Sequence, residues 1–93
     1  FPMGSMTGAP KIESMNIIDE YESIKRGLYS GSIGYIKPNK DFDFNVVIRS
    51  IIYDKLLKEI NVSVGSAITF KSDPESEFEE CLLKAEPMIK SLK

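Results

Sequence analysis

The chain has 93 residues, of which 42% are hydrophobic and 28% are charged, a composition typical of one small globular domain rather than a disordered segment. Its 12 basic and 14 acidic residues give a net charge of −2 without a block of one sign, which argues against a nucleic acid or a membrane surface as partner. With Cys81 as the only cysteine and no histidine, an internal disulfide, zinc-type clusters and Ser-His or Cys-His pairs are excluded, so any metal must be bound by oxygen.

The chain opens with "FPMGSMTGAP", a stretch rich in glycine, proline and serine that reads as a turn. Because the first residue is Phe1 and not methionine, we expect a piece of a longer protein. No charged and apolar leader opens the sequence, which makes a cytoplasmic setting the default expectation. Residues 10–25 are rich in helix formers, with proline in the first turn and Gly27 just after the end, and predict a helix.

Three strand-like runs follow, at residues 28–36, 42–54 and 59–70. The segments between them, "KPNKD" and "KLLK", are short enough for hairpin links, which predicts an antiparallel meander. A second helix closes the chain, with Asp73 as its cap and Pro74 in its first position. The predicted fold class is α+β, in the order αβββα with antiparallel strands.

One charged residue, Arg49, interrupts the apolar run "FNVVIRSII" in the second predicted strand. A guanidinium stays protonated at physiological pH, so an arginine buried in a strand needs an anionic partner. One interpretation is structural, either an internal carboxylate or an arginine at the strand edge whose charged end reaches water. The other is a ligand carboxylate or phosphate held by two parallel hydrogen bonds. The strand alone leaves both interpretations open.

The last predicted helix carries two stripes. Glu77, Glu80 and Lys84 lie at spacings of three and four and therefore share one face. The apolar stripe beside them comprises Phe78, Cys81, Leu82, Ala85, Ile89 and Leu92. A solvated face with a Glu80–Lys84 ion pair is the simpler interpretation. The alternative is that the two carboxylates bind a hard cation such as Mg²⁺.

Glycine and small hydroxyl residues recur in "GSMTGAP", "SGSIG" and "VGSA". Backbone amides in such segments can approach an anion closely, because no bulky side chain intervenes. Glycine within a strand also marks a bulge or tight packing. Each segment by itself is therefore open to either interpretation.

Several longer motifs resemble the chorismate-utilising enzymes. "FPMGSMTGAPK" resembles the G-S-x-T-G-A-P-K signature of that family, and "IIDEYE", "RGLYSGSIGYI", "DFNVVIRS" and "SDPESEFEECLLKA" resemble its next blocks in the same order. The resemblance implies that residues 1–93 are the C-terminal portion of a chorismate-binding domain, a layered α/β sandwich with two large antiparallel sheets. The family's nucleophilic lysine, a histidine near the ring and a further Mg²⁺-binding glutamate would lie upstream, so no catalytic residue is expected in this chain.

The resemblance also assigns substrate contacts to particular residues. Arg49 and Tyr29 would hold the enolpyruvyl carboxylate of chorismate, together with a backbone amide from Gly65. Ser5 and Lys84 would lie near the ring carboxylate. By resemblance, then, the anion that Arg49 requires is a carboxylate of chorismate.

A metal site is implied in the same way. Glu80 would be a direct Mg²⁺ ligand, and Glu77 a second or water-mediated one. The sequence departs from the family at two small positions. The usual "GAG" is "GSA" here, with Ala67 in place of a glycine, and Cys81 stands where threonine is common. Both changes leave the backbone donors in place.

The form of the G-S-x-T-G-A-P-K signature favours the aminodeoxychorismate synthase branch of the family. Those enzymes aminate chorismate with ammonia from a glutamine amidotransferase partner, on the route to p-aminobenzoate and folate. Anthranilate synthase component I is the alternative within the family. The chain alone is expected to be inactive. A hypothesis of another class is an inactive module that self-associates through exposed sheet edges, forming a homo-oligomer.

Overall fold

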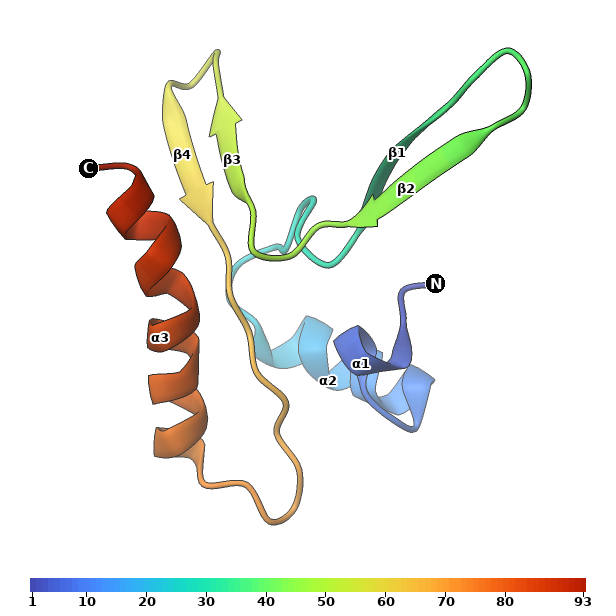
Figure 1. Cartoon of the computed structure of the whole chain (residues 1–93). Helices are drawn as coiled ribbons and strands as arrows, with labels where there is room; N and C mark the ends of the chain where they lie inside the picture. The colour runs from blue at the N-terminus through green and yellow to red at the C-terminus, as the bar shows by residue number, and fades with distance from the viewer. The chain divides into compact units, whose positions relative to one another are not determined.

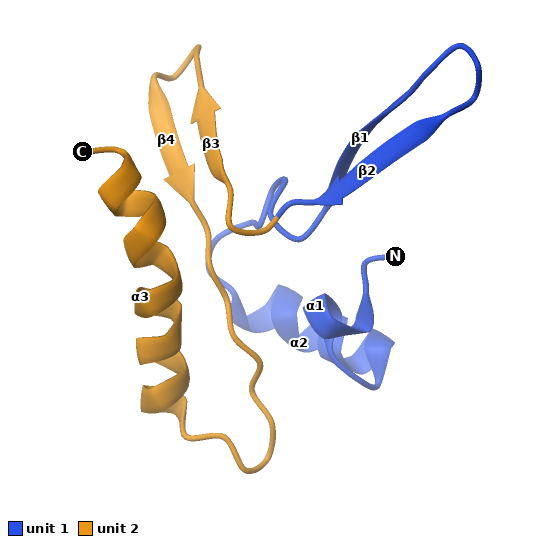
Figure 2. Cartoon of the chain, viewed as in Figure 1, with its two compact units in different colours: residues 1–47 blue, residues 48–93 orange.

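The computed structural model describes residues 1–93, which form two compact units, Phe1–Val47 and Ile48–Lys93 (Figure 1, Figure 2). The first unit contains α1 (Gly4–Thr7), α2 (Lys11–Tyr21), β1 (Ser32–Ile36) and β2 (Phe42–Val46). The second contains β3 (Ile51–Asp54), β4 (Glu59–Val62) and α3 (Pro74–Ser91). The predicted α+β class with antiparallel strands is confirmed, although the element order is ααββββα rather than αβββα.

In the first unit, β1 and β2 form a two-stranded antiparallel hairpin, in which Ser32 pairs with Val46 at the open end. The loop between the strands is closed by the amide of Lys37, which donates to the carbonyl of Asp41 at 2.7 Å. In the second unit, β3 and β4 form the other hairpin. The Asp54 carboxylate ends β3 by accepting hydrogen bonds from two amides of the turn. Both predicted hairpin links are confirmed.

The prediction of one continuous strand over residues 42–54 is wrong. Just after β2, Val47 makes the last backbone pairings of this hairpin: its amide donates to the carbonyl of Gly31 and its carbonyl accepts from the amide of Ser30, both at 3.0 Å. Two residues later, Arg49 has a φ of 50°, in the left-handed region. An extended strand cannot continue through that conformation. The strands therefore form two separate two-stranded sheets and not a three-stranded meander.

The predicted strand at 28–36 begins late, because residues 28–31 form a turn. The amide of Gly31 donates to the carbonyl of Leu28 at 3.0 Å, and Ser30 has a φ of 66°. The predicted strand at 59–70 ends early for a different reason. Its partner β3 has only four residues, so residues beyond Val62 have no strand to pair with.

At the N-terminal end, the helix predicted over residues 10–25 stops at Tyr21. The chain then turns through Gly27, whose φ of 59° suits glycine. The one-turn helix α1 was not predicted. Its first carbonyl, that of Gly4, accepts a hydrogen bond from the amide of Gly8 at 2.7 Å.

Helix α3 begins as predicted, with Pro74 in its first turn and the Asp73 carboxylate accepting from the amide of Ser76 at 3.2 Å. The same carboxylate accepts from the Ser76 hydroxyl at 2.6 Å. These hydrogen bonds lower the pKa of Asp73. The helix also continues through Pro87, which removes one internal hydrogen bond.

The apolar side chains are poorly covered. Only Val47 and Met88 among the hydrophobic residues are buried, together with the polar residues Thr7 and Ser30. The predicted apolar stripe of α3 is largely exposed, with Phe78 at 64%. Apolar surface on this scale marks faces that contact something else. None of the three helices has the length and apolar composition that a membrane span requires.

Candidate functional site

Arg49 lies between β2 and β3 and is exposed, so the prediction that it is buried in a strand is wrong. In the second unit no carboxylate is close enough to form an ion pair with its guanidinium. The internal carboxylate considered from the sequence is therefore not found there. The backbone of Arg49 has a φ of 50°, a conformation that costs a residue with a side chain about 1–2 kcal/mol. Backbone strain of this kind concentrates at ligand-binding positions.

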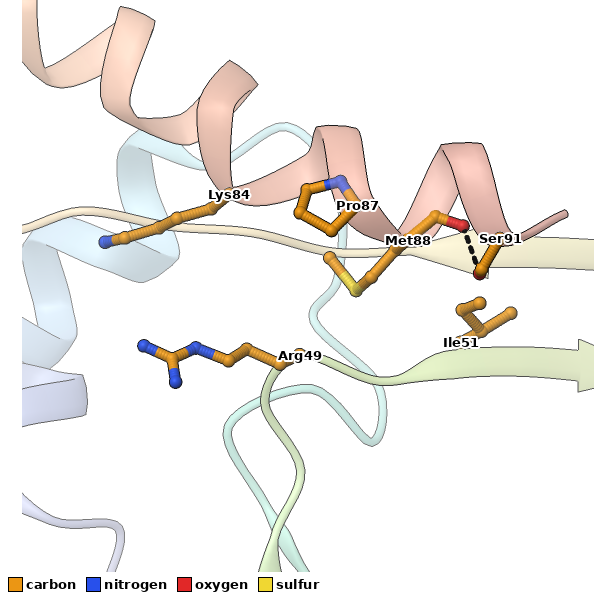
Figure 3. Close-up of a pocket in the computed structure, with 6 residues that line it drawn as sticks. All are labelled: Arg49, Ile51, Lys84, Pro87, Met88 and Ser91. Atoms are coloured by element: carbon orange, nitrogen blue, oxygen red, sulfur yellow. Dashed lines mark hydrogen bonds between the residues drawn. The ribbon is translucent and has the colours of Figure 1, made fainter.

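Arg49 and Lys84 line a pocket of about 490 Å³ in the second unit (Figure 3). The remaining lining is mostly apolar and consists of Ile51, Pro87, Met88 and Ser91. Figure 3 shows the two cationic side chains extended in the same direction, so that the guanidinium and the ammonium lie at the same end. The volume is in the range of small-molecule sites. Two cations at one end of an apolar pocket suit a small ligand that carries carboxylates.

Lys84 connects α3 to the loop after β4. Its ammonium lies 2.5 Å from a carboxylate oxygen of Glu80 and donates a hydrogen bond to the carbonyl of Gly65 at 3.0 Å. The predicted Glu80–Lys84 ion pair is thus present. The hydrogen bond from Lys84 is the main cause that lowers the pKa of Glu80. Glu80 is exposed, as a solvated face predicts, whereas Lys84 in addition contacts the loop.

A second contact fixes the same loop. The hydroxyl of Ser66 donates to the backbone carbonyl of Glu77 at 3.2 Å. The loop is therefore attached to α3 at two points along the helix, at the backbone of Glu77 and at the side chain of Lys84. The amide of Gly65, which the resemblance assigns to a substrate carboxylate, makes no backbone hydrogen bond. It remains a donor that a ligand could use.

Glu77 and Glu80 lie on the same face of α3, and Glu77 makes a further, smaller contribution to the lowered pKa of Glu80. No group of three or more acidic or cysteine side chains is present that could hold a metal. Two carboxylates nonetheless provide the hard oxygen ligands that Mg²⁺ takes while keeping several waters. The donor set therefore fits a partial Mg²⁺ site in which the ion pair with Lys84 occupies one Glu80 oxygen.

The two other predicted site residues belong to the first unit. Ser5 lies exposed on α1. Tyr29 is half-buried in the turn before β1, and its amide donates to the carbonyl of Arg26 at 3.1 Å. The position of Tyr29 on a strand, as predicted, is wrong. The structure thus gathers Arg49 with Lys84 and its partners in one unit, and Ser5 with Tyr29 in the other.

Two polar residues in these surroundings were missed from the sequence. Ser66 was considered only for its backbone, within "VGSA", whereas its hydroxyl contacts α3. Arg26 was considered only as a charge at a helix end, whereas it makes hydrogen bonds to three other residues. The spacing of four between Glu22 and Arg26 was the available signal for the second.

Comparison with known proteins identifies the family to which the chain belongs. The sequence model of the family described as "chorismate binding enzyme" matches residues 1–90. A protein of Arabidopsis thaliana named "Aminodeoxychorismate synthase, chloroplastic" is 54% identical over 84 residues, which cover 90% of this chain and 9% of that protein. The "Aminodeoxychorismate synthase" of Streptomyces griseus is 46% identical over 92 residues, covering 99% of this chain and 12% of that protein.

A relative from the other branch is also similar. "Anthranilate synthase component 1" of Aquifex aeolicus (strain VF5) is 40% identical over 92 residues, covering 99% of this chain and 18% of that protein. The chain therefore spans less than a fifth of the length of each of these three relatives.

Proposed function

Because the chain belongs to the chorismate-binding enzymes, we propose that it is the C-terminal part of an aminodeoxychorismate synthase. The longer protein, called here the parent enzyme, would convert chorismate and ammonia to 4-amino-4-deoxychorismate. Identity reaches 54% with an aminodeoxychorismate synthase and 44% with an anthranilate synthase component 1, which supports this branch. The chain covers only a tenth or so of those proteins and is expected to be inactive alone.

The observation that carries the proposal is the pocket that Arg49 and Lys84 line together. Chorismate carries two carboxylates on a mostly apolar ring. Arg49 would bind the enolpyruvyl carboxylate through two parallel hydrogen bonds, with help from the Gly65 amide of the same unit. The family resemblance alone adds the Tyr29 hydroxyl to this carboxylate. Lys84 and Ser5 would lie near the ring carboxylate. Fixed through both carboxylates, the ring would be oriented for substitution.

Mg²⁺ is the proposed cofactor, with Glu80 as a direct ligand and Glu77 as a second or water-mediated one. When bound, the ion would offset negative charge on a substrate carboxylate. The role of this chain is then to position the two glutamates on α3. The loop after β4 supports that role, because it contacts the Glu77 backbone and the Lys84 ammonium of this helix.

The parent enzyme would receive ammonia from a glutamine amidotransferase and would serve p-aminobenzoate and folate synthesis, in the cytoplasm. Anthranilate synthase component I is the second candidate, favoured by the 40% identity to the Aquifex protein over nearly the whole chain. The two differ in the carbon that is aminated, C4 in the first and C2 in the second.

Product analysis separates the two candidates. The parent enzyme would be incubated with chorismate, an ammonium salt and Mg²⁺, and the products separated by chromatography with mass detection. We expect 4-amino-4-deoxychorismate, which retains the enolpyruvyl group. Anthranilate and released pyruvate would assign the chain to the second branch, and unreacted chorismate would contradict both.

A further inference from the structure

The guanidinium of Arg26 connects three segments of the first unit. Its Nε and Nη2 donate to the two carboxylate oxygens of Glu22 at 2.9 and 2.6 Å. Its Nη1 donates to the backbone carbonyl of Met6 at 3.0 Å and lies 3.5 Å from the hydroxyl of Ser30. One planar group thus joins the end of α2, the one-turn helix α1 and the turn before β1. A lysine could not reproduce this arrangement, because an ammonium lacks the fork of fixed donors.

The two groups that Nη1 contacts adjoin the two site residues of this unit. Met6 follows Ser5 directly, and Ser30 follows Tyr29. Ser30 is buried, and its amide donates to the carbonyl of Val47 at 3.0 Å. A displacement of either backbone segment would therefore move a residue that the proposed function places at the substrate.

The pair is also electrostatically favourable. The hydrogen bond and the charge of Arg26 lower the pKa of the Glu22 carboxyl, and Glu22 in turn raises the pKa of Arg26. The nearby Tyr29 contributes to the second shift to a smaller extent. The ion pair therefore stays intact at neutral pH, and the guanidinium stays oriented by Glu22.

We propose that Arg26 is a positioning residue for chorismate binding: held by Glu22, it fixes the backbone beside Ser5 and the turn that carries Tyr29. The inference rests on the proposed function, since it assumes that these two residues contact chorismate. Arg26 itself would not touch the substrate, and it would act on the affinity for chorismate rather than on the use of ammonia.

Steady-state kinetics of the parent enzyme test this inference, with both KM values and kcat measured. Arg26→Gln should raise the KM for chorismate about tenfold, the effect expected if a displaced Tyr29 or Ser5 loses one charge-assisted hydrogen bond to the substrate, and leave the KM for ammonia within about twofold. Arg26→Lys should recover only part of the loss. Glu22→Gln keeps Arg26 but removes the carboxylate that orients its guanidinium. This variant should raise the KM for chorismate by about threefold. The matched control is Lys90→Gln, which breaks another ion pair at spacing four, with Glu86, and should change neither KM.

Each other outcome is decisive. An unchanged chorismate KM in both Arg26→Gln and Glu22→Gln would overturn the inference. So would a fall in kcat with equal rises in both KM values and a lower Tm, because that pattern indicates a general structural role. If Arg26→Gln does not fold, Glu22→Gln decides alone. Tyr29→Phe measured in parallel separates the two proposals: if it weakens chorismate binding while the Arg26 and Glu22 variants do not, only the positioning role fails. If the parent enzyme does not aminate chorismate at all, the proposed function fails.

Discussion

The ammonium of Lys84 donates a hydrogen bond to the carbonyl of Gly65 at 3.0 Å, across 19 positions of sequence. The same ammonium lies 2.5 Å from a Glu80 oxygen. A side chain on α3 thus sets the position of a glycine whose amide is proposed to bind substrate. It also holds the carboxylate that is proposed to bind Mg²⁺. The proposed substrate contact of Gly65 and the proposed metal contact of Glu80 therefore share one partner, Lys84.

The first prediction concerns that link. Lys84→Gln in the 93-residue chain should raise the pKa of Glu80 toward its ordinary value of 4.5, because the hydrogen bond and the charge that lower it are lost. Since the folded-state pKa is depressed, the stabilisation by this pair is present above about pH 4.5 and lost as the pH falls through the lower folded value. NMR titration of the side-chain carboxyl carbons measures the shift. Lys90→Gln is the control, and a Glu80 pKa that is the same in both variants would contradict the assignment.

The second prediction concerns Arg49 in the parent enzyme. Arg49→Ala should weaken chorismate binding by about 2–5 kcal/mol, which raises KM about thirtyfold or more. Arg49→Lys should recover little, because a lysine cannot make two parallel hydrogen bonds. Chorismate KM values measure both effects.

A control variant for Arg49 makes use of the positive φ of its backbone. Glycine adopts a positive φ at no steric cost, so Arg49→Gly should be more stable than Arg49→Ala by about 1 kcal/mol while binding chorismate equally poorly. Denaturant unfolding measures the difference. A KM within about twofold of wild type in either variant would show that the guanidinium does not contact the substrate.

The third prediction separates a metal site from a surface ion pair. In the parent enzyme, Glu80→Gln should abolish activity at ordinary Mg²⁺ concentrations, and Glu77→Gln should raise the Mg²⁺ concentration needed for half-maximal turnover. A surface ion pair predicts unchanged turnover instead. Titrating turnover with Mg²⁺ in wild type and both variants decides, and overlapping curves would remove both residues from the metal site.

The fourth prediction concerns the chain alone. It should not turn over chorismate with ammonia and Mg²⁺, because catalytic groups act as a unit and the relatives are at least five times longer. Its exposed apolar side chains should also make it self-associate. Product assays and sedimentation at micromolar protein test the two parts. Turnover would contradict the first, and a clean monomer would contradict the second.

The sequence was sufficient for those elements whose signals are local. Helix α3 starts where Asp73 and Pro74 predict, because a cap and a first-turn proline act over a few residues. Both hairpin loops were found for the same reason. The Glu80–Lys84 pair followed from helical spacing alone.

The remaining features depend on contacts that are distant in sequence or on backbone conformation. Nothing in "VVIRSII" shows that Arg49 adopts a positive φ, since β-branched neighbours favour an extended strand. The burial of Arg49 was consequently predicted wrongly. The contact of Lys84 with Gly65 spans a loop without regular structure, whose path no periodicity encodes. Tyr29 was predicted to lie on a strand because the turn that contains it has a strand-like composition.

The most direct measurement of whether these residues bind chorismate uses a chimera. Residues 1–93 would replace the matching segment of the Streptomyces griseus aminodeoxychorismate synthase, to which they are 46% identical. The account predicts that the chimera forms 4-amino-4-deoxychorismate with a chorismate KM near that of the host, and that Arg49→Ala in the chimera raises this KM about thirtyfold or more. A chimera that unfolds at the same temperature as the host but has no activity, or whose chorismate KM is indifferent to Arg49→Ala, would contradict it.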